Sequence, residues 1–166
     1  ARGERFALAD LITALTAEAQ SALLARVPAL RGLRLVRPGA VHRLPVLPPG
    51  AALQPTLQLR HAPTVLVAGT IAGGLGYNEA IATGHVAGYN AARLAGGAEP
   101  LVLPEASLTG QLCRWLAQSP AGPGGLVQAN FGMLPEVPGE AGGKQERHRR
   151  QAERALAAVR AFAAAH

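Results

Sequence analysis

Residues 65–94 read VLVAGTIAGGLGYNEAIATGHVAGYNAARL, an apolar run, then a glycine-rich stretch, then small residues at helical spacing. The apolar, β-branched run from Val65 to Gly69 predicts a buried parallel strand, and residues 79–94 predict a helix packed closely on a sheet. The stretch between them contains four glycines: Gly69, Gly73, Gly74 and Gly76. Glycine permits backbone conformations closed to other residues, so this loop can approach a flat or phosphorylated ligand closely.

The glycine spacing departs from the dinucleotide-binding fingerprint. It is not GxGxxG, and the acidic residue expected about 20 positions later is missing. The pattern alone therefore leaves two interpretations open: a loop that faces a cofactor, or a purely structural turn from strand to helix.

The same residues resemble the motif G-Q-I-x-G-x-x-G-Y-x-E-A-A-x-x-G-x-x-A-G-x-N-A-A. Two groups of FAD-dependent tRNA-modifying proteins share it: the folate-dependent tRNA uracil methyltransferases (TrmFO) and the GidA-type wobble-uridine enzymes. Four further blocks are similar to the first group, in that family's order: VPALRGLRLVRPGAVHR (27–43), QPTLQLRHAPTVLVAG (54–69), PEASLTGQLCRWL (104–116) and QANFGMLPEV (128–137). The resemblance runs from about residue 27 to the end and covers only the family's carboxyl-terminal part.

This resemblance implies an α/β fold. The chain would be the carboxyl-terminal part of a Rossmann-like FAD-binding domain, a strand, glycine loop and helix with flanking helices. Residues 1–40 would end an inserted substrate-side domain, and residues 41–166 would belong to the FAD-binding domain and its carboxyl-terminal helices. The implied reaction transfers a one-carbon unit from methylenetetrahydrofolate to the 5-position of a T-loop uridine in tRNA, with FAD and with NADPH or NADH as reductant.

The resemblance also assigns site residues. The cofactor-binding set is Gly69, Thr70, Gly73, Gly74, Gly76, Tyr77 and Glu79. Tyr77 aligns with a tyrosine that lies against the flavin ring, where an aromatic side chain can stack; the alternative is that it only covers the end of the strand. Glu79 falls in the first helical turn, where the helix dipole alone favours a carboxylate, and a role in the site stays open. The Asn130-Phe131-Gly132 block is expected near the active-site wall.

An arginine-rich segment precedes the family's His-Arg pair. The predicted RNA-binding residues are Arg34, Arg37, His42 and Arg43. Arginine can contact phosphate bidentately, so these residues are candidates for holding tRNA; a solvated basic surface is the alternative. The net charge of +6 and the pI near 11.0 permit a polyanionic partner without requiring one.

The sequence contains a single cysteine, Cys113. Cys113 lies among Leu112, Trp115 and Leu116, so we expect a buried structural thiol, and one cysteine excludes an internal disulfide. The family's catalytic cysteines lie upstream of the matching region, so no catalytic residue and no metal site is predicted here. No apolar run is long enough to span a membrane, and a cytoplasmic location is the default expectation.

The remaining pattern predicts a helix broken near Thr16 and ended by Pro28, then short strands near Leu33, Leu35 and Val41. A proline-rich loop over residues 45–55, a helix capped by Ser107 and a terminal helix from Lys144 follow. The apolar stripe of that last helix is Ala152, Ala155, Leu156, Val159 and Phe162.

Several positions depart from the family pattern. Thr70, Ala72 and Leu75 replace Gln, Thr and Glu, and residues 44–46 (Leu-Pro-Val) replace Asn-Thr-Tyr. GxGxxG, which holds the FAD pyrophosphate, is absent from the 166 residues, so we expect this chain to be inactive alone and to need an amino-terminal half, in the same or a separate chain. A GidA-like wobble-uridine protein and a non-catalytic RNA-binding or interaction remnant remain alternatives.

Overall fold

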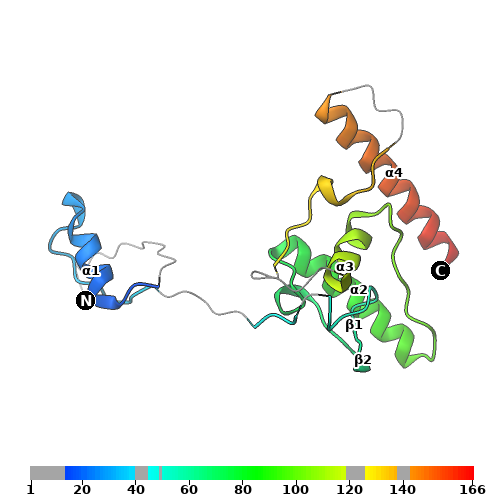
Figure 1. Cartoon of the computed structure of the whole chain (residues 1–166), viewed down its shortest axis with the longest axis horizontal. Helices are drawn as coiled ribbons and strands as arrows, with labels where there is room; N and C mark the ends of the chain where they lie inside the picture. The colour runs from blue at the N-terminus through cyan, green and yellow to red at the C-terminus, as the bar shows by residue number, and fades with distance from the viewer. Residues whose placement is uncertain (1–13, 40–44, 49, 119–125, 138–142) are drawn as a thin grey trace, which may run out of the picture. The chain divides into compact units, whose positions relative to one another are not determined.

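The computed structural model describes residues 14–39, 45–48, 50–118, 126–137 and 143–166 (Figure 1). The chain divides into two compact units, Ala1–Arg43 and Leu44–His166. This division lies close to the predicted domain boundary, and the roles assigned to the two domains stay predictions.

The first unit is built around one short helix. Helix α1 (Ala17–Ala25) follows Thr16, whose hydroxyl accepts a hydrogen bond from the Ala19 N–H at 3.3 Å. The helix predicted before Thr16 lies almost entirely outside the described residues, so the predicted break stays a prediction. The 3₁₀ helix η1 (Pro28–Leu30) follows. The buried amide of Gln20 bonds to both the N–H and the C=O of Gly39, at 2.8 and 2.9 Å.

The strands predicted near Leu33 and Leu35 are wrong, because residues 31–39 contain no strand. This segment has no neighbouring strand among the described residues of its unit, and its end is instead held by the Gln20 amide. Val41 lies outside the described residues.

The second unit contains a short hairpin, β1 (Gln58–Leu59) with β2 (Ala62–Leu66). The expected strand therefore exists, three residues earlier than predicted, but it is antiparallel and its central side chains are exposed; Val65 is 45% exposed. The prediction of a buried parallel strand is wrong in this chain. Arg60 and His61 reverse the chain into a tight hairpin, whereas a parallel neighbour needs a crossover that the described residues do not supply.

Helices form most of the second unit (Figure 1). The elements in order are η2 (Gly69–Ala72), α2 (Tyr77–Ala95), α3 (Leu108–Gln118), η3 (Phe131–Met133) and α4 (Lys144–Ala165). Ser107 caps α3 as predicted, because its hydroxyl accepts a hydrogen bond from the Gly110 N–H at 3.0 Å. The described parts of the proline-rich loop contain neither helix nor strand, also as predicted.

The core joins α2 and α3 to the loop that precedes β1. Its buried apolar side chains are Leu53, Leu57, Ala72, Val86, Ala87, Leu112, Cys113 and Leu116. Asn90 brings a polar group into this core and satisfies it completely: its amide bonds to the carbonyls of Thr56 and Leu101 and accepts from the Leu101 N–H. These bonds tie α2 to the segments around Thr56 and Leu101.

Helix α4 carries the predicted apolar stripe, but the described residues do not bury it. Leu156 is 57% exposed and Val159 is 40% exposed. The helix contacts the rest of its unit through its first half, near η3.

Candidate functional site

The glycine loop between β2 and α2 requires its glycines. Gly69, Gly73 and Gly76 have φ of 68°, 105° and 125°, a region that residues with side chains rarely adopt. Gly74 lies in a tight place, since an added Cβ would be 3.1 Å from the Glu79 Cβ, closer than most Cβ contacts. The loop therefore folds back tightly on the first turn of α2.

A second segment lies beside this loop as a short parallel bridge. The Val127 N–H donates to the Gly73 carbonyl and the Leu75 N–H donates to the Val127 carbonyl, both at 2.8 Å. Two residues further on, the Ala129 N–H donates to Glu79 Oε1 at 2.8 Å. The structure thus places residues 127–129, which directly precede the Asn130-Phe131-Gly132 block, against the glycine loop.

Glu79 lies between the glycine loop and residues 127–129, in contact with both. Its side chain is buried, and the backbone of Gly76 is so close that an added Cβ there would lie 2.5 Å from Glu79 Oε2. The carboxylate also stands in the first turn of α2, where it offsets the positive end of the helix dipole. An anionic ligand would therefore compete with a carboxylate already present at this helix end.

Thr83 is a site residue that the sequence analysis missed. Its hydroxyl accepts a hydrogen bond from the Gly69 N–H at 2.9 Å and donates to the Glu79 carbonyl at 2.6 Å. The available signal was its spacing: Thr83 follows Glu79 by four residues and so lies on the same face of the helix. It holds the start of the loop, whereas Glu79 bonds to Ala129 in the segment beside the loop.

Tyr77 opens α2 and is 89% exposed. The ring therefore does not cover the end of β2, which was the alternative to a role in stacking. Other large apolar side chains of the loop and of the following helix are exposed too: Ile71 at 45%, Leu75 at 39% and Ile81 at 70%.

The RNA-binding role of Arg34, Arg37, His42 and Arg43 stays a prediction. Arg34 and Arg37 are exposed in the first unit, and His42 and Arg43 lie outside the described residues.

Cys113 is 1% exposed, and burial raises the pKa of its thiol to about 12. The thiol is therefore protonated at neutral pH. The predicted burial of Cys113 is confirmed. In the part of the chain that is described, no group of three or more His, Cys, Asp or Glu residues could hold a metal ion, and no helix is long and apolar enough to cross a membrane.

Comparison with known proteins gives the family. Residues 1–99 match the family model for glucose inhibited division protein A. The chain is 40% identical over 146 residues to methylenetetrahydrofolate–tRNA-(uracil-5-)-methyltransferase TrmFO of Synechococcus sp. (strain RCC307). The aligned region is 88% of this chain and 32% of that protein. It is 43% identical over 142 residues to the TrmFO of Deinococcus radiodurans (84% and 30%).

The TrmFO of Thermotoga neapolitana is 35% identical over 160 residues, 96% of this chain and 37% of that protein. The chain thus spans about a third of the length of these curated relatives. The family-model match extends over the glycine loop, the first turn of α2 and both residues that anchor the loop from α2, Glu79 and Thr83. The chain belongs to the glucose inhibited division protein A family and, within it, resembles the TrmFO methyltransferases.

Proposed function

We propose that this chain is the carboxyl-terminal part of a folate- and FAD-dependent tRNA uracil-5-methyltransferase. The reaction transfers a one-carbon unit from methylenetetrahydrofolate to the 5-position of a T-loop uridine, and NADPH or NADH supplies electrons. The observation that carries the proposal is the glycine loop joined through Glu79 to residues 127–129, in a chain whose relatives are named as methylenetetrahydrofolate-dependent tRNA methyltransferases.

The loop fits a flat ring better than a phosphate. Positive φ at Gly73 and Gly76 leaves backbone without side chains at the start of α2, and the exposed Tyr77 stands at the same place. The Glu79 carboxylate makes this helix end a poor site for a phosphate. When bound, FAD would supply the redox chemistry of the one-carbon transfer.

The candidate site residues then have different roles. The loop backbone from Gly69 to Gly76 would approach the flavin ring closely, and Tyr77 would stack on it. Glu79 and Thr83 hold the loop in shape. Contacts to the FAD pyrophosphate would come from outside these 166 residues, because GxGxxG is not among them. Arg34, Arg37, His42 and Arg43 would contact tRNA phosphates.

The second candidate is a GidA-like role in wobble-uridine modification. The family-model match suits both candidates, whereas the similarity to TrmFO relatives extends to residues after the glycine loop and favours the methyltransferase. A non-catalytic remnant is the third candidate, because Ala72 is buried and Leu75 exposed where the resembled family has polar residues.

Two measurements test the proposal. The protein as its gene encodes it, given methylenetetrahydrofolate, NADPH and an unmodified tRNA transcript, should form 5-methyluridine in the T loop, detected by mass spectrometry of nuclease digests. A modified wobble uridine would favour the GidA-like role. A folded, flavin-loaded protein that modifies no tRNA would contradict both.

The second measurement titrates residues 1–166 alone with FAD and follows flavin fluorescence. We expect no micromolar binding, because the main backbone contacts to the pyrophosphate are absent. Micromolar binding without another chain would show that this account misplaces the cofactor.

A further inference from the structure

Helix α4 changes character halfway along its length. Its first half, residues 144–154, reads KQERHRRQAER and contains seven lysines, arginines and glutamates. Its second half, residues 155–165, reads ALAAVRAFAAA and contains one charged residue, Arg160. We call residues 155–165 the apolar end of α4. Alanine is a good helix former and needs no partner, so the large side chains of this end are the ones that call for an explanation.

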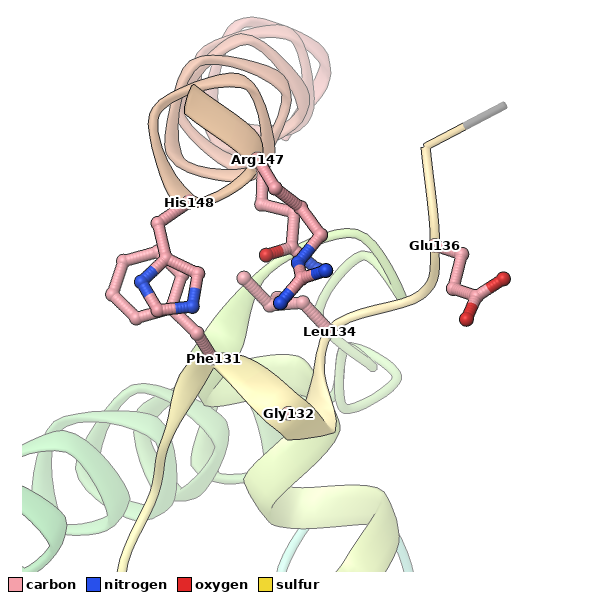
Figure 2. A pocket seen from close by; sticks show the side chains of 7 residues that line it. Phe131, Gly132, Leu134, Glu136, Arg147 and His148 are labelled. Carbon is pink, nitrogen blue, oxygen red and sulfur yellow. The ribbon is translucent and has the colours of Figure 1, made fainter. Parts of the chain in front are cut away.

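The first half of α4 has partners within its unit. Figure 2 shows the ring of His148 stacked on Phe131, beside a pocket of about 290 Å³; the ring centroids are 4.4 Å apart and the planes are inclined by 15°. The guanidinium of Arg154 donates hydrogen bonds to the carbonyl oxygens of Pro135 and Glu136. The charged half of the helix is therefore held against η3 and the segment that follows it.

The described residues leave the apolar end of α4 largely uncovered. Leu156 is 57% exposed and Val159 is 40% exposed, and the ring of Phe162 stacks on His166 of the same chain end, with centroids 4.4 Å apart. Successive residues of a helix lie about 100° apart, so these three large side chains lie within about 120° of the helix surface. They form one apolar face, whereas exposed apolar residues are normally scattered singly.

The longer relatives contain this helix within a larger protein. The region aligned with the TrmFO of Thermotoga neapolitana is 96% of this chain, so it includes most of α4. The same region is only 37% of that protein, and the larger part of it has no counterpart in these 166 residues. That larger part is available to cover the apolar face.

The size of the face favours a segment of the same protein over a second copy of it. The apolar end of α4 is about 16 Å long and one helix diameter, about 10 Å, wide. A stable interface between separate proteins buries about 800 Å² on each partner, which a face of this size does not reach. A segment of the same chain needs less area, because its connection keeps it at an effective concentration in about the millimolar range.

We propose that the apolar end of α4 docks on an apolar surface of the part of the protein that precedes Ala1. The inference rests on the proposed function, in which a preceding part supplies GxGxxG. It gives α4 a role that the proposed reaction does not: the helix is fixed to this unit by its charged half and to the preceding part by its apolar half.

The first test measures stability in the protein as its gene encodes it. Leu156→Gln combined with Val159→Gln removes two large apolar side chains, and glutamine preserves the helix because it is a good helix former. Ala157→Gln combined with Ala161→Gln is the matched control on the opposite side of the helix. The first pair should lower the urea midpoint, because it places polar groups in an apolar contact, and the control pair should leave it unchanged. Equal midpoints for the two pairs would show that the face is solvated and would overturn the proposal.

The second test identifies what covers the face. A photoreactive diazirine amino acid in place of Leu156 should cross-link to a peptide that precedes Ala1, identified by mass spectrometry. The same group in place of Ala157 should not. A cross-linked dimer would assign the face to a second copy, and a cross-link to residues 1–43 would assign it to the first unit; either result would overturn the proposal. So would a folded protein without any cross-link from Leu156.

Cross-linking and methyl transfer are independent measurements. A cross-link from Leu156 to the preceding part, in a protein that modifies no tRNA, would support the docking and count against the proposed function. Methyl transfer by a protein that lacks this cross-link would overturn the docking and leave the proposed function standing.

Discussion

Glu79 Oε1 accepts a 2.8 Å hydrogen bond from the backbone N–H of Ala129, fifty residues away in the sequence. The bond connects the first turn of α2 to the segment that leads into Asn130 and η3. Because Glu79 is buried, water has little access to its carboxylate and competes little with the Ala129 N–H for it. Glu79 therefore adds a side-chain bond to the two backbone bonds by which Val127 joins the same two blocks of the candidate site.

Glu79→Ala should destabilise the chain by about 1–3 kcal/mol, because it leaves the Ala129 N–H without its acceptor. Glu79→Gln keeps an acceptor oxygen and should lose less. Urea denaturation gives the free energies of unfolding, and hydrogen exchange should show the Ala129 amide losing protection. Asn78→Ala, an exposed position in the same helical turn, is the control. Equal stability of Glu79→Ala and Asn78→Ala would show that the bond contributes nothing.

Cys113 gives a prediction for alkaline pH. Burial raises the pKa of its thiol from 9.0 to about 12, so between these pH values the unfolded chain releases a proton that the folded chain retains. Its contribution is intact below pH 9, and the free energy of unfolding should then fall by about 1.4 kcal/mol per pH unit towards pH 12. Cys113→Ala should lack this part of the slope. Parallel pH profiles for the two proteins would contradict the burial of the thiol.

Arg34, Arg37 and Arg43 give a prediction about salt. If they contact tRNA phosphates, the logarithm of the binding constant should fall with the logarithm of salt concentration by about 0.7–0.9 per contact. Replacing all three by alanine in the intact protein should flatten this slope, measured by filter binding from low to moderate salt. Unchanged affinity and slope would leave these arginines as a solvated surface.

Local signals predicted much of the fold. Thr16 and Ser107 cap helices because their side chains satisfy N–H groups in the first turn, which depends only on neighbouring residues. The burial of Cys113 followed from the apolar residues at helical spacing around it. Of the four loop glycines, Gly69, Gly73 and Gly76 have positive φ, as their type indicated, and Gly74 does not.

Contacts between distant segments could not be predicted in this way. The pairing of Gly73 and Leu75 with Val127, and of Glu79 with Ala129, depends on how the chain folds back and leaves no periodic signal. The strand at residues 62–66 was mispredicted for the same reason, because its partner, rather than its own composition, decides whether it is parallel and buried. The burial of Gln151 in α4 also gave no signal, since a glutamine in a charged helix is usually solvated.

Tyr77 tests the central claim, that the glycine loop faces a flavin. The ring is 89% exposed at the start of α2, and stacking on a flat cofactor would add about 0.5–1.5 kcal/mol beyond its burial. Tyr89, half exposed and twelve residues further along the same helix, lies about 18 Å away along its axis and is the matched control.

The decisive measurement is the flavin content and absorption spectrum of the purified, complete protein with Tyr77→Ala, Tyr77→Phe or Tyr89→Ala. We expect Tyr77→Ala to lose flavin and methyl transfer, Tyr77→Phe to keep most of its flavin, and folded Tyr89→Ala to keep a normal flavin spectrum. Full flavin occupancy and an unchanged spectrum in Tyr77→Ala would contradict the placement of the flavin at this loop.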